Sequence, residues 1–293
     1  MKHILLEAYN LCVNGYQNLA WEKIQEVENL GVEQALNYDQ AEIDKYNFNK
    51  GWYLIRNGKY NEGSQLLEAG RFVNAYGGQF LKTDKPLWNP EEYSPLGKTL
   101  LVKMEGGIGD ELINIRFVKN IKQHGFSKVY VLTSTNISVI LSRVEGVDAV
   151  YTDENYLPEF DFWLPSFSIG WLSGASENNI SGEKYLHANQ AHVDIFKDLF
   201  KTDKIKVGIR WSGNPEFEDQ QHRVFPKEYM FELASIFPDI QFYSFQRDAD
   251  TENIPGNIIN LENYLMSWED TTSAISHMDL VISSCTSVAH LSA

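Results

Sequence analysis

The sequence predicts a mixed α/β protein with parallel sheets and a smaller helical region in front of them. Up to about Arg71, apolar residues recur at helical spacing, with almost no strand pattern. From Thr99 onward, short β-branched and apolar runs alternate with helical segments, the order that produces a parallel sheet covered by helices. The first run ends in a glycine-rich turn and an aspartate, Asp110. Strand, glycine turn and helix form the unit with which α/β proteins hold ligands at the carboxyl ends of their strands.

The first 75 residues have the pattern of paired helices. Gly15 and Gly58 fall where one helix would stop and another begin. Small, aliphatic and aromatic residues stand at the spacing of one tetratricopeptide repeat, at Gly51, Leu54, Tyr60, Gly63 and Gly70. A weaker copy runs from Leu11 to Val27. A plain helical hairpin cap explains the same pattern, so both interpretations stay open. If the helices are tetratricopeptide-like repeats, we expect them to bind a protein partner.

Residues 76–97, with their prolines, glycines and aromatic residues, read as an irregular linker. Beyond the linker, the strand pattern recurs at residues 99–103, 128–133, 146–150, 160–165, 206–211, 241–245, 258–261 and 279–283. Helical patterns follow the glycine turn to residue 117 and recur at residues 137–144, 228–237 and 268–278. This alternation predicts two α/β domains in series.

Charge and cysteine content narrow the classes of function. A net charge of −15 argues against duplex DNA or an anionic membrane as partner, because phosphate contacts need a basic surface. The two cysteines, Cys12 and Cys285, imply no disulfide framework and fit a reducing compartment. Residues 1–11 are too short and too charged for a signal peptide, and no apolar run reaches the length of a membrane span. We expect a cytoplasmic protein with no transmembrane segment and no nucleic-acid partner.

The glycine turn does not match the common cofactor fingerprints. Gly107 and Gly109 supply the first two glycines of G-x-G-x-x-G, but the third position is Leu112. No acidic residue closes the next strand, where a ribose ligand would be expected, and no Gly-Lys-Ser/Thr follows the glycines. No His/Cys cluster has metal-ligand spacing. We therefore expect no bound cofactor and no metal.

Four motifs follow one another along the chain. They are Glu105-Gly-Gly-Ile-Gly-Asp110, Arg210-Trp-Ser-Gly-Asn214 with Arg223 downstream, Tyr243-Ser-Phe-Gln246, and Asp279-Leu-Val-Ile-Ser-Ser-Cys-Thr-Ser-Val-Ala-His-Leu291. Together these motifs resemble glycosyltransferase family 9. Their order and spacing cover roughly residues 46–293. They are most similar to the branch in which a heptosyltransferase-like domain follows tetratricopeptide repeats.

The resemblance implies a GT-B-like pair of Rossmann-type domains behind a small all-α region. The domains expected on this basis are residues 1–75 (tetratricopeptide-like), 76–97 (linker), 98–203 (acceptor domain) and 204–293 (nucleotide-sugar donor domain). The implied reaction is an inverting, metal-independent sugar transfer. The co-substrate is a nucleotide-diphosphate-sugar, and the acceptor is a hydroxyl of a polysaccharide, a lipopolysaccharide-type or other lipid-linked glycan, or a protein.

The resemblance also assigns roles to residues. Asp110 matches the general base, and Gly106, Gly107 and Gly109 form the turn that presents it. The positions matching donor contacts are Ser212, Gly213, Asn214, Arg223, Gln246, Thr286, Ser287 and His290. The chemistry agrees, because transfer needs a base for the acceptor hydroxyl. It also needs positive potential on the departing diphosphate, which Arg223 and the N–H groups of the Thr286 turn would supply.

Each of these residues also has a plain structural explanation. Asp110 can cap the following helix, since aspartate is among the best capping residues. Arg223 can pair with Glu218 or Asp219, Thr286 and Ser287 can be helix caps, and His290 can be an ordinary structural histidine. The glycines need only a tight turn to be explained.

Two departures from the family pattern support a second hypothesis. Cys285 stands where the family has an aspartate, and a doubly wound domain normally has one more strand and helix after the position of Ala293. The C-terminal domain is therefore expected to be incomplete, either as a fragment or as a member without full donor binding. On the second hypothesis, the chain is a non-catalytic interaction module with a degenerate transferase domain.

Overall fold

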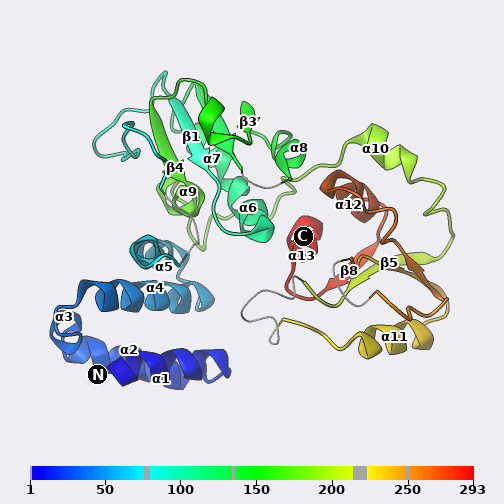
Figure 1. Cartoon of the computed structure of the whole chain (residues 1–293), viewed down its shortest axis with the longest axis horizontal. Helices are drawn as coiled ribbons and strands as arrows, with labels where there is room; N and C mark the ends of the chain where they lie inside the picture. Colours follow the sequence, from blue (N-terminus) through cyan, green and yellow to red (C-terminus); the bar gives the residue numbers. More distant parts are fainter. Residues whose placement is uncertain (1, 76–79, 134–135, 214–222, 248–250) are drawn as a thin grey trace. The chain divides into compact units, whose positions relative to one another are not determined.

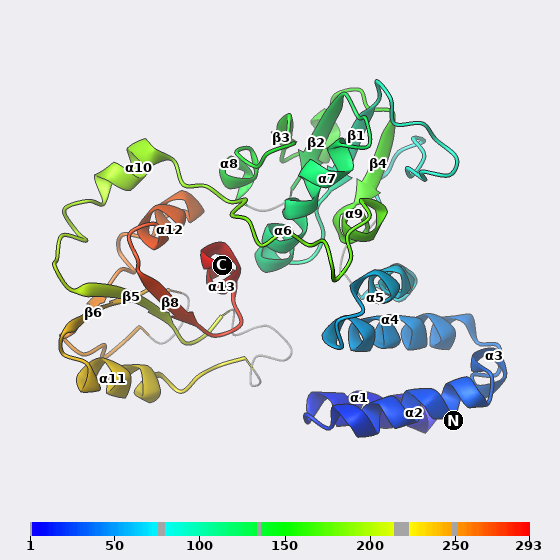
Figure 2. The same ribbon diagram turned by 180° about the vertical axis from the view of Figure 1, so that it is seen from behind.

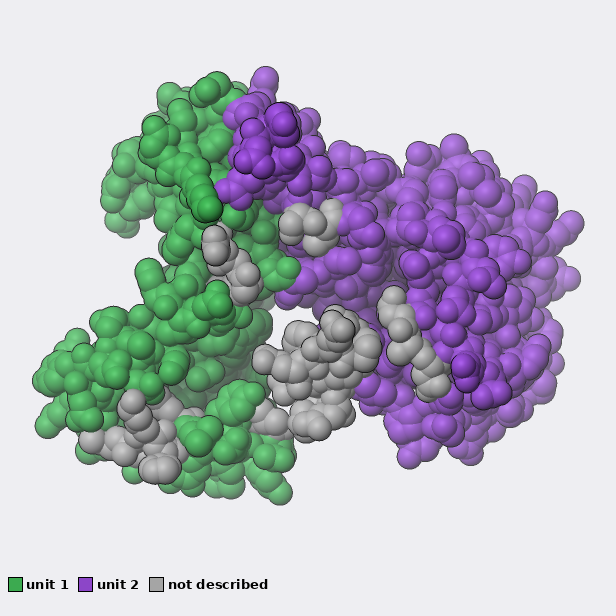
Figure 3. Space-filling view, viewed as in Figure 1, with its two compact units in different colours: residues 1–106, 120–127, 159–182 green, residues 107–119, 128–158, 183–293 purple. Residues whose placement is uncertain are grey.

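The computed structural model describes residues 2–75, 80–133, 136–213, 223–247 and 251–293. The chain forms two compact units, which Figure 3 shows in different colours. Unit 1 contains residues 1–106, 120–127 and 159–182, and unit 2 contains residues 107–119, 128–158 and 183–293. Neither unit is continuous in sequence, because the chain crosses between them at the glycine turn and at four further positions.

The elements follow the predicted order (Figure 1). The helical region contains α1 (Lys2–Val13), α2 (Gln17–Asn29), α3 (Val32–Ala35), α4 (Gln40–Arg56), α5 (Tyr60–Leu67) and the 3₁₀ helix η1 (Glu68–Val73). The strands are β1 (Thr99–Lys103), β2 (Lys128–Leu132), β3 (Ala149–Tyr151), β4 (Phe162–Pro165), β5 (Ile205–Arg210), β6 (Ile240–Ser244), β7 (Ile258–Asn260) and β8 (Leu280–Ser283).

Helices or 3₁₀ turns lie between most of these strands. They are α6 (Ile108–Asn114), η2 (Ile115–Phe117), α7 (Val118–Lys122), α8 (Ser138–Leu141), η3 (Glu154–Tyr156), α9 (Ser166–Leu172), α10 (Gln190–Ile195), α11 (Lys227–Ile236), α12 (Trp268–Ile275) and α13 (Ser287–Ser292). All eight strand patterns correspond to strands, within three residues at each end. The mixed α/β fold with a helical region in front is therefore confirmed, while the four domain bounds stay predictions.

The helices of unit 1 pack in pairs, α1 with α2 and α4 with α5 (Figure 2). Gly15 and Gly58 stand between the members of each pair with φ of +84° and +80°, a left-handed conformation that favours glycine. A Cβ on Gly51 would lie 2.7 Å from the carbonyl oxygen of Gly63, and one on Gly63 would lie 2.6 Å from that of Gly51. The two small residues therefore permit the close helix contact that the repeat pattern predicts. Whether the pairs are tetratricopeptide repeats stays a prediction.

The strands form two four-stranded sheets with the same connectivity, β3-β2-β1-β4 and β7-β6-β5-β8. The pairs β1–β4, β2–β3, β5–β6, β5–β8 and β6–β7 are parallel. In each sheet the strand order reverses beside the first strand in sequence, between β1 and β4 and between β5 and β8. Ligands of open α/β sheets bind beyond the carboxyl ends of the strands at such a switch point.

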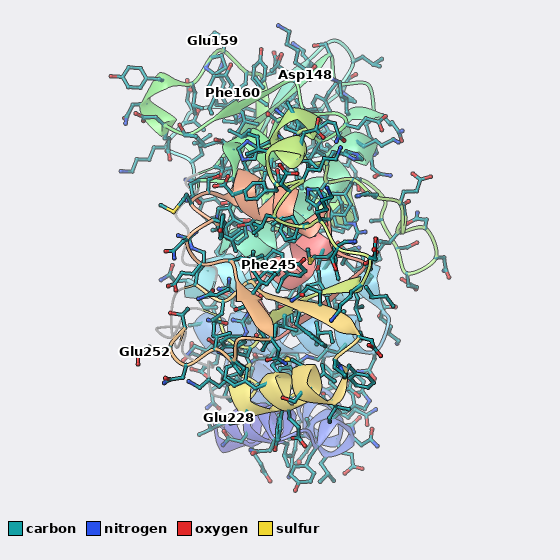
Figure 4. The ribbon with its side chains drawn as sticks, turned by 90° about the vertical axis from the view of Figure 1, so that its right-hand side faces the viewer. Asp148, Glu159, Phe160, Glu228, Phe245 and Glu252 are labelled. Carbon is teal, nitrogen blue, oxygen red and sulfur yellow. The ribbon has the colours of Figure 1, made fainter. Side chains whose placement is uncertain are left out.

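Helices cover both faces of the second sheet, with α11 on one side and α12 and α13 on the other (Figures 1 and 2). The core beneath α11 contains Ile209, Trp211 and Phe242 together with Met230 and Ala234 of the helix. The opposite core contains Phe245, labelled in Figure 4, with Ala274 of α12 and Val288 of α13. Because both faces are buried, the strands read as nearly continuous apolar runs.

The described part of the linker, residues 80–97, packs against the first sheet within unit 1. Trp88 is buried, donates its main-chain N–H to the Trp163 carbonyl at 3.1 Å, and packs its ring edge against Phe126. Within the described ranges, no helix is long and apolar enough to cross a membrane.

The glycine contact between α4 and α5 gives the first testable prediction. Gly51→Ala should lower the free energy of unfolding of the helical region by about 1–3 kcal/mol, because the new methyl would overlap a carbonyl oxygen that cannot move without shifting α5. Gly182→Ala is the matched control in the same unit, because nothing lies within 4 Å of its Cβ position. Urea unfolding followed by helical circular dichroism measures both. Equal stability of the two variants would contradict the close contact.

Candidate functional site

The candidate site lies within unit 2, where the amino-terminal end of α6 packs against α13. The chain reaches α13 through a short turn at the carboxyl end of β8. Because β5 and β6 are parallel to β8, their carboxyl ends lie at the same edge of the sheet. The second switch point is thus bordered by residues from three strand ends and by α6. This arrangement brings together Asp110, His290 and Arg223.

Asp110 is the third residue of α6 and caps the helix from that position. The helix begins at Ile108 with Gly107 as its N-cap, and Gly107 N–H donates to Asp110 Oδ2 at 2.8 Å. Asp110 therefore does cap α6, as the structural explanation expects, but from the third helical position and not from the N-cap position. Gly106 has a φ of +76°, so the tight turn in front of the helix requires glycine. The cap bond from Gly107 engages Oδ2 of the Asp110 carboxylate.

Gly109 serves a different purpose from Gly106. A Cβ at Gly109 would lie 2.9 Å from His290 Cδ2, 3.5 Å from His290 Nε2 and 3.7 Å from Ser287 Oγ. Glycine is thus required here because the His290 ring lies directly over the α6 backbone. The predicted turn residue is a packing residue, and it brings His290 close to Asp110.

Charge interactions link Asp110, His290 and Arg223. Burial raises the pKa of the Asp110 carboxyl group, against the Gly107 hydrogen bond and the charges of His290 and Arg223, which lower it. Burial also lowers the pKa of His290, with Asp110 acting to raise it and Arg223 to lower it. Both shifts favour the neutral form of a half-buried group. A carboxylate whose proton affinity is raised is better matched to accept a proton near neutral pH.

Arg223 contacts the turn between β8 and α13. Its Nη2 donates to the main-chain carbonyl of Cys285 at 2.7 Å and lies 3.4 Å from Cys285 Sγ. The acidic partners considered from the sequence, Glu218 and Asp219, lie outside the described residues. The contact with Cys285 had no sequence signal, since a main-chain acceptor 62 positions away leaves no pattern. Arg223 therefore adds positive charge to the β8 turn.

Thr286 is the N-cap of α13, but its side chain makes no cap hydrogen bond. Its buried hydroxyl instead pairs with Ser283 Oγ at 3.0 Å. Ser287 opens α13 with its Oγ near Gly109. The simple capping explanation therefore fails for the Thr286 hydroxyl, and its predicted donor contact stays a prediction, as does that of Ser287.

Ser212 and Gln246 brace each other across the ends of β5 and β6. The Gln246 side chain accepts from Ser212 N–H at 3.1 Å and donates to Ser212 Oγ at 2.9 Å, and Gln246 is fully buried. Arg210, also buried, donates to the carbonyls of Ser212 and Phe245 at 3.0 Å each. These bonds fix the position at which the chain enters Gly213. Asn214 lies outside the described residues.

Two buried charged residues were missed as candidates. Arg210 is a buried cation at a strand end, and its place in the motif was the signal that could have found it. Glu111, next to Asp110, is buried and accepts from Thr133 Oγ1 at 2.6 Å, which ties α6 to the end of β2. Among the described side chains, no group of three or more His, Cys, Asp and Glu is placed to hold a metal ion.

No protein-family model matches the sequence. No curated protein matches it either. Solved structures are similar to the chain. The glycosyl transferase family 9 from Veillonella parvula DSM 2008 aligns with a TM-score of 0.52 at 11% identity, over 68% of this chain and 78% of that one. ADP-heptose lps heptosyltransferase II of E. coli aligns with a TM-score of 0.48 at 11% identity, over 66% and 81%. The likeness to the Veillonella structure shows a shared fold.

The charges around His290 predict its titration. Its imidazole should titrate below the ordinary pKa of 6.5. In Asp110→Asn the pKa should fall further because an attractive charge is lost, and in Arg223→Met it should rise because a repulsive charge is lost. Imidazole NMR across a pH series measures all three, with His192, paired to Asp270, as internal control. Shifts of the same sign in both variants would contradict the arrangement.

The contact between Gly109 and His290 predicts a non-additive effect on stability. Gly109→Ala should lower the free energy of unfolding by about 1–3 kcal/mol through overpacking. The added cost should largely vanish in a His290→Ala background, where the ring is gone. Gly256→Ala, with nothing within 4 Å of the new methyl, is the control. Additive costs in the double variant would show that the ring does not lie over Gly109.

Proposed function

We propose that the chain is a glycosyltransferase of GT-B-like architecture that moves a sugar from a nucleotide-diphosphate-sugar to a hydroxyl acceptor with inversion. The observation that carries the proposal is the grouping of Asp110, His290 and Arg223 at the edge where β5 and β8 end. The fold shared with the Veillonella glycosyltransferase supports the same reaction class. The acceptor is a glycan, a lipid-linked glycan or a protein.

Asp110 acts as the general base in this proposal. Its carboxylate takes the proton of the acceptor hydroxyl while that oxygen attacks the anomeric carbon and the bond from this carbon to the diphosphate oxygen breaks. The raised pKa of Asp110 supports this role, because a base works best when its pKa approaches the working pH. Capping and catalysis are compatible, since Gly107 N–H engages Oδ2 and the proton can be taken by Oδ1.

Arg223 stabilises the departing diphosphate. The guanidinium offers several N–H donors in a planar fork that suits phosphate oxygens, and it stays charged throughout the reaction. Thr286, Ser287 and Gly213 complete the donor site in the proposal. Ser212 and Gln246 act on the donor through the loop that they brace, because their side chains bond to each other.

The proposed roles of Asp110 and Arg223 predict a loss of turnover for one variant and a loss of diphosphate binding for the other. Asp110→Asn keeps an oxygen that can accept from Gly107 N–H but removes the base, so turnover should fall by about 10²-fold or more while donor binding stays. Arg223→Met should weaken binding of a nucleoside diphosphate by about tenfold or more, because a charge-assisted hydrogen bond is lost. Calorimetry with ADP, UDP and GDP measures binding. Release of the diphosphate from the matching sugar nucleotides measures turnover.

The same experiments decide between the two classes of function. Unchanged turnover of Asp110→Asn would remove Asp110 from the base role. If the folded wild-type protein binds none of the three diphosphates at millimolar concentration, the transferase proposal fails. The non-catalytic interaction module would then be the better description of the chain.

A further inference from the structure

A buried ion pair joins the helical region to the start of the glycine turn, within unit 1. Arg71 of η1 donates from Nη2 to Glu105 Oε2 at 3.1 Å and to Ser168 Oγ at 2.9 Å. The side chains of Arg71 and Glu105 are only 7% and 9% exposed. Most surface ion pairs contribute little, but breaking a buried one is costly because a charge is left without its partner. This pair is therefore a firm attachment of η1.

Glu105 is also held by the first turn of α9. Its main-chain N–H donates to Ser166 Oγ at 3.0 Å, and its Oε2 accepts from Phe167 N–H at 3.3 Å. Since β1 pairs with β4 in parallel and α9 follows β4 directly, these contacts lie at the switch point of the first sheet. In many α/β proteins a ligand occupies that place. In this chain Glu105, the second residue after β1, is bonded to protein groups at this switch point.

The charge of Arg71 keeps these contacts in place. Burial raises the pKa of Glu105, and the nearby Arg71 is the largest influence that lowers it again. An ionised carboxylate accepts more strongly from Phe167 N–H than a neutral acid does. Removing the Arg71 charge would therefore weaken both the ion pair and the bond to α9.

Glu105 and Asp110 stand at the two ends of one short segment. Gly106, next to Glu105, has the left-handed φ of +76°, and Gly107 N–H donates to Asp110 Oδ2 at 2.8 Å. The residue that fixes the direction of the Asp110 carboxylate is thus two positions from Glu105. Gly106 and Gly107 provide no side chains that could hold the turn in front of α6, so the course of this turn depends on the residues on either side of it.

We propose that Arg71 is a positioning residue, whose ion pair with Glu105 fixes the glycine turn and through it the orientation of Asp110. The inference rests on the proposed function for its catalytic consequence only. On this inference the helical region affects the reaction by holding the glycine turn, in addition to any binding of a protein partner. Displacing a catalytic base by about 1 Å can lower the rate by up to about 10²-fold. An ion pair at Glu105, five positions before Asp110, can therefore affect the rate.

The same helical segment offers a matched control. Glu68, also in η1, accepts at Oε1 from Ser168 Oγ at 2.7 Å and from Trp171 Nε1 at 3.0 Å. The bond from Trp171 attaches η1 to α9 without touching the glycine turn. Trp171→Phe therefore weakens the attachment alone, whereas Arg71→Met weakens both the attachment and the hold on Glu105.

Amide hydrogen exchange and steady-state kinetics on the full chain test the inference. Arg71→Met should speed exchange in residues 104–112 by about fivefold or more and lower kcat by about tenfold, with the donor KM nearly unchanged. Trp171→Phe should leave both exchange in that segment and kcat near the wild-type values. Arg71→Lys keeps the charge but not the fork that spans Glu105 and Ser168, so it should recover part of both losses.

The outcomes separate this inference from the proposed function. Unchanged exchange in residues 104–112 of Arg71→Met, or equal effects of Arg71→Met and Trp171→Phe, would overturn the positioning role. If Arg71→Met does not fold, Arg71→Lys decides by the same two measurements. If the wild-type protein transfers no sugar, the proposed function fails, while the exchange data still decide whether Arg71 holds the turn.

Discussion

The close packing of α6 on α13 is the constraint on which the candidate site depends. It exists because Gly109 has no Cβ, and a methyl there would lie 2.9 Å from the His290 ring. Two segments about 180 positions apart in sequence thereby become neighbours. The glycine turn supplies a carboxylate, and the far end of the chain supplies an imidazole and the turn that Arg223 contacts. Without this contact the glycine-turn motif would be separated from the other three motifs, which β5, β6 and β8 already bring to one edge of their sheet.

The two sheets share a strand order, and at the switch point of each sheet protein groups bond to one another. At the first switch point, Glu105 bonds to Ser166, Phe167 and Arg71, so protein groups satisfy each other. At the second, the Ser212 and Gln246 side chains also satisfy each other. In both cases the paired groups shape a turn at the end of a strand. Hydrogen bonds among residues at the strand ends thus hold the turns that follow the strands at each switch point.

Local pattern was enough to predict the fold, and long-range contacts limited the prediction of the site. The strands were recognisable because residues buried on both faces give continuous apolar runs, as in β1 and β4. The helix breaks at Gly15 and Gly58 were recognisable because a left-handed φ favours glycine. The bonds of Arg223 to Cys285 and of Arg71 to Glu105 join positions 62 and 34 apart, and no local pattern encodes them. Motif resemblance could select Arg223 but could not say what it touches.

The effect of Asp110 and His290 on folding stability supports the interpretation of their surroundings as a functional site. Because the pKa of Asp110 is raised on folding, its ionised form opposes stability at neutral pH, and this cost is relieved as pH falls through the raised value. Because the pKa of His290 is lowered, its cost is absent at neutral pH and develops as pH falls below the ordinary histidine value. A site selected for stability alone would replace Asp110 by an uncharged residue. A half-buried carboxylate that reduces stability at neutral pH is typical of sites retained for chemistry.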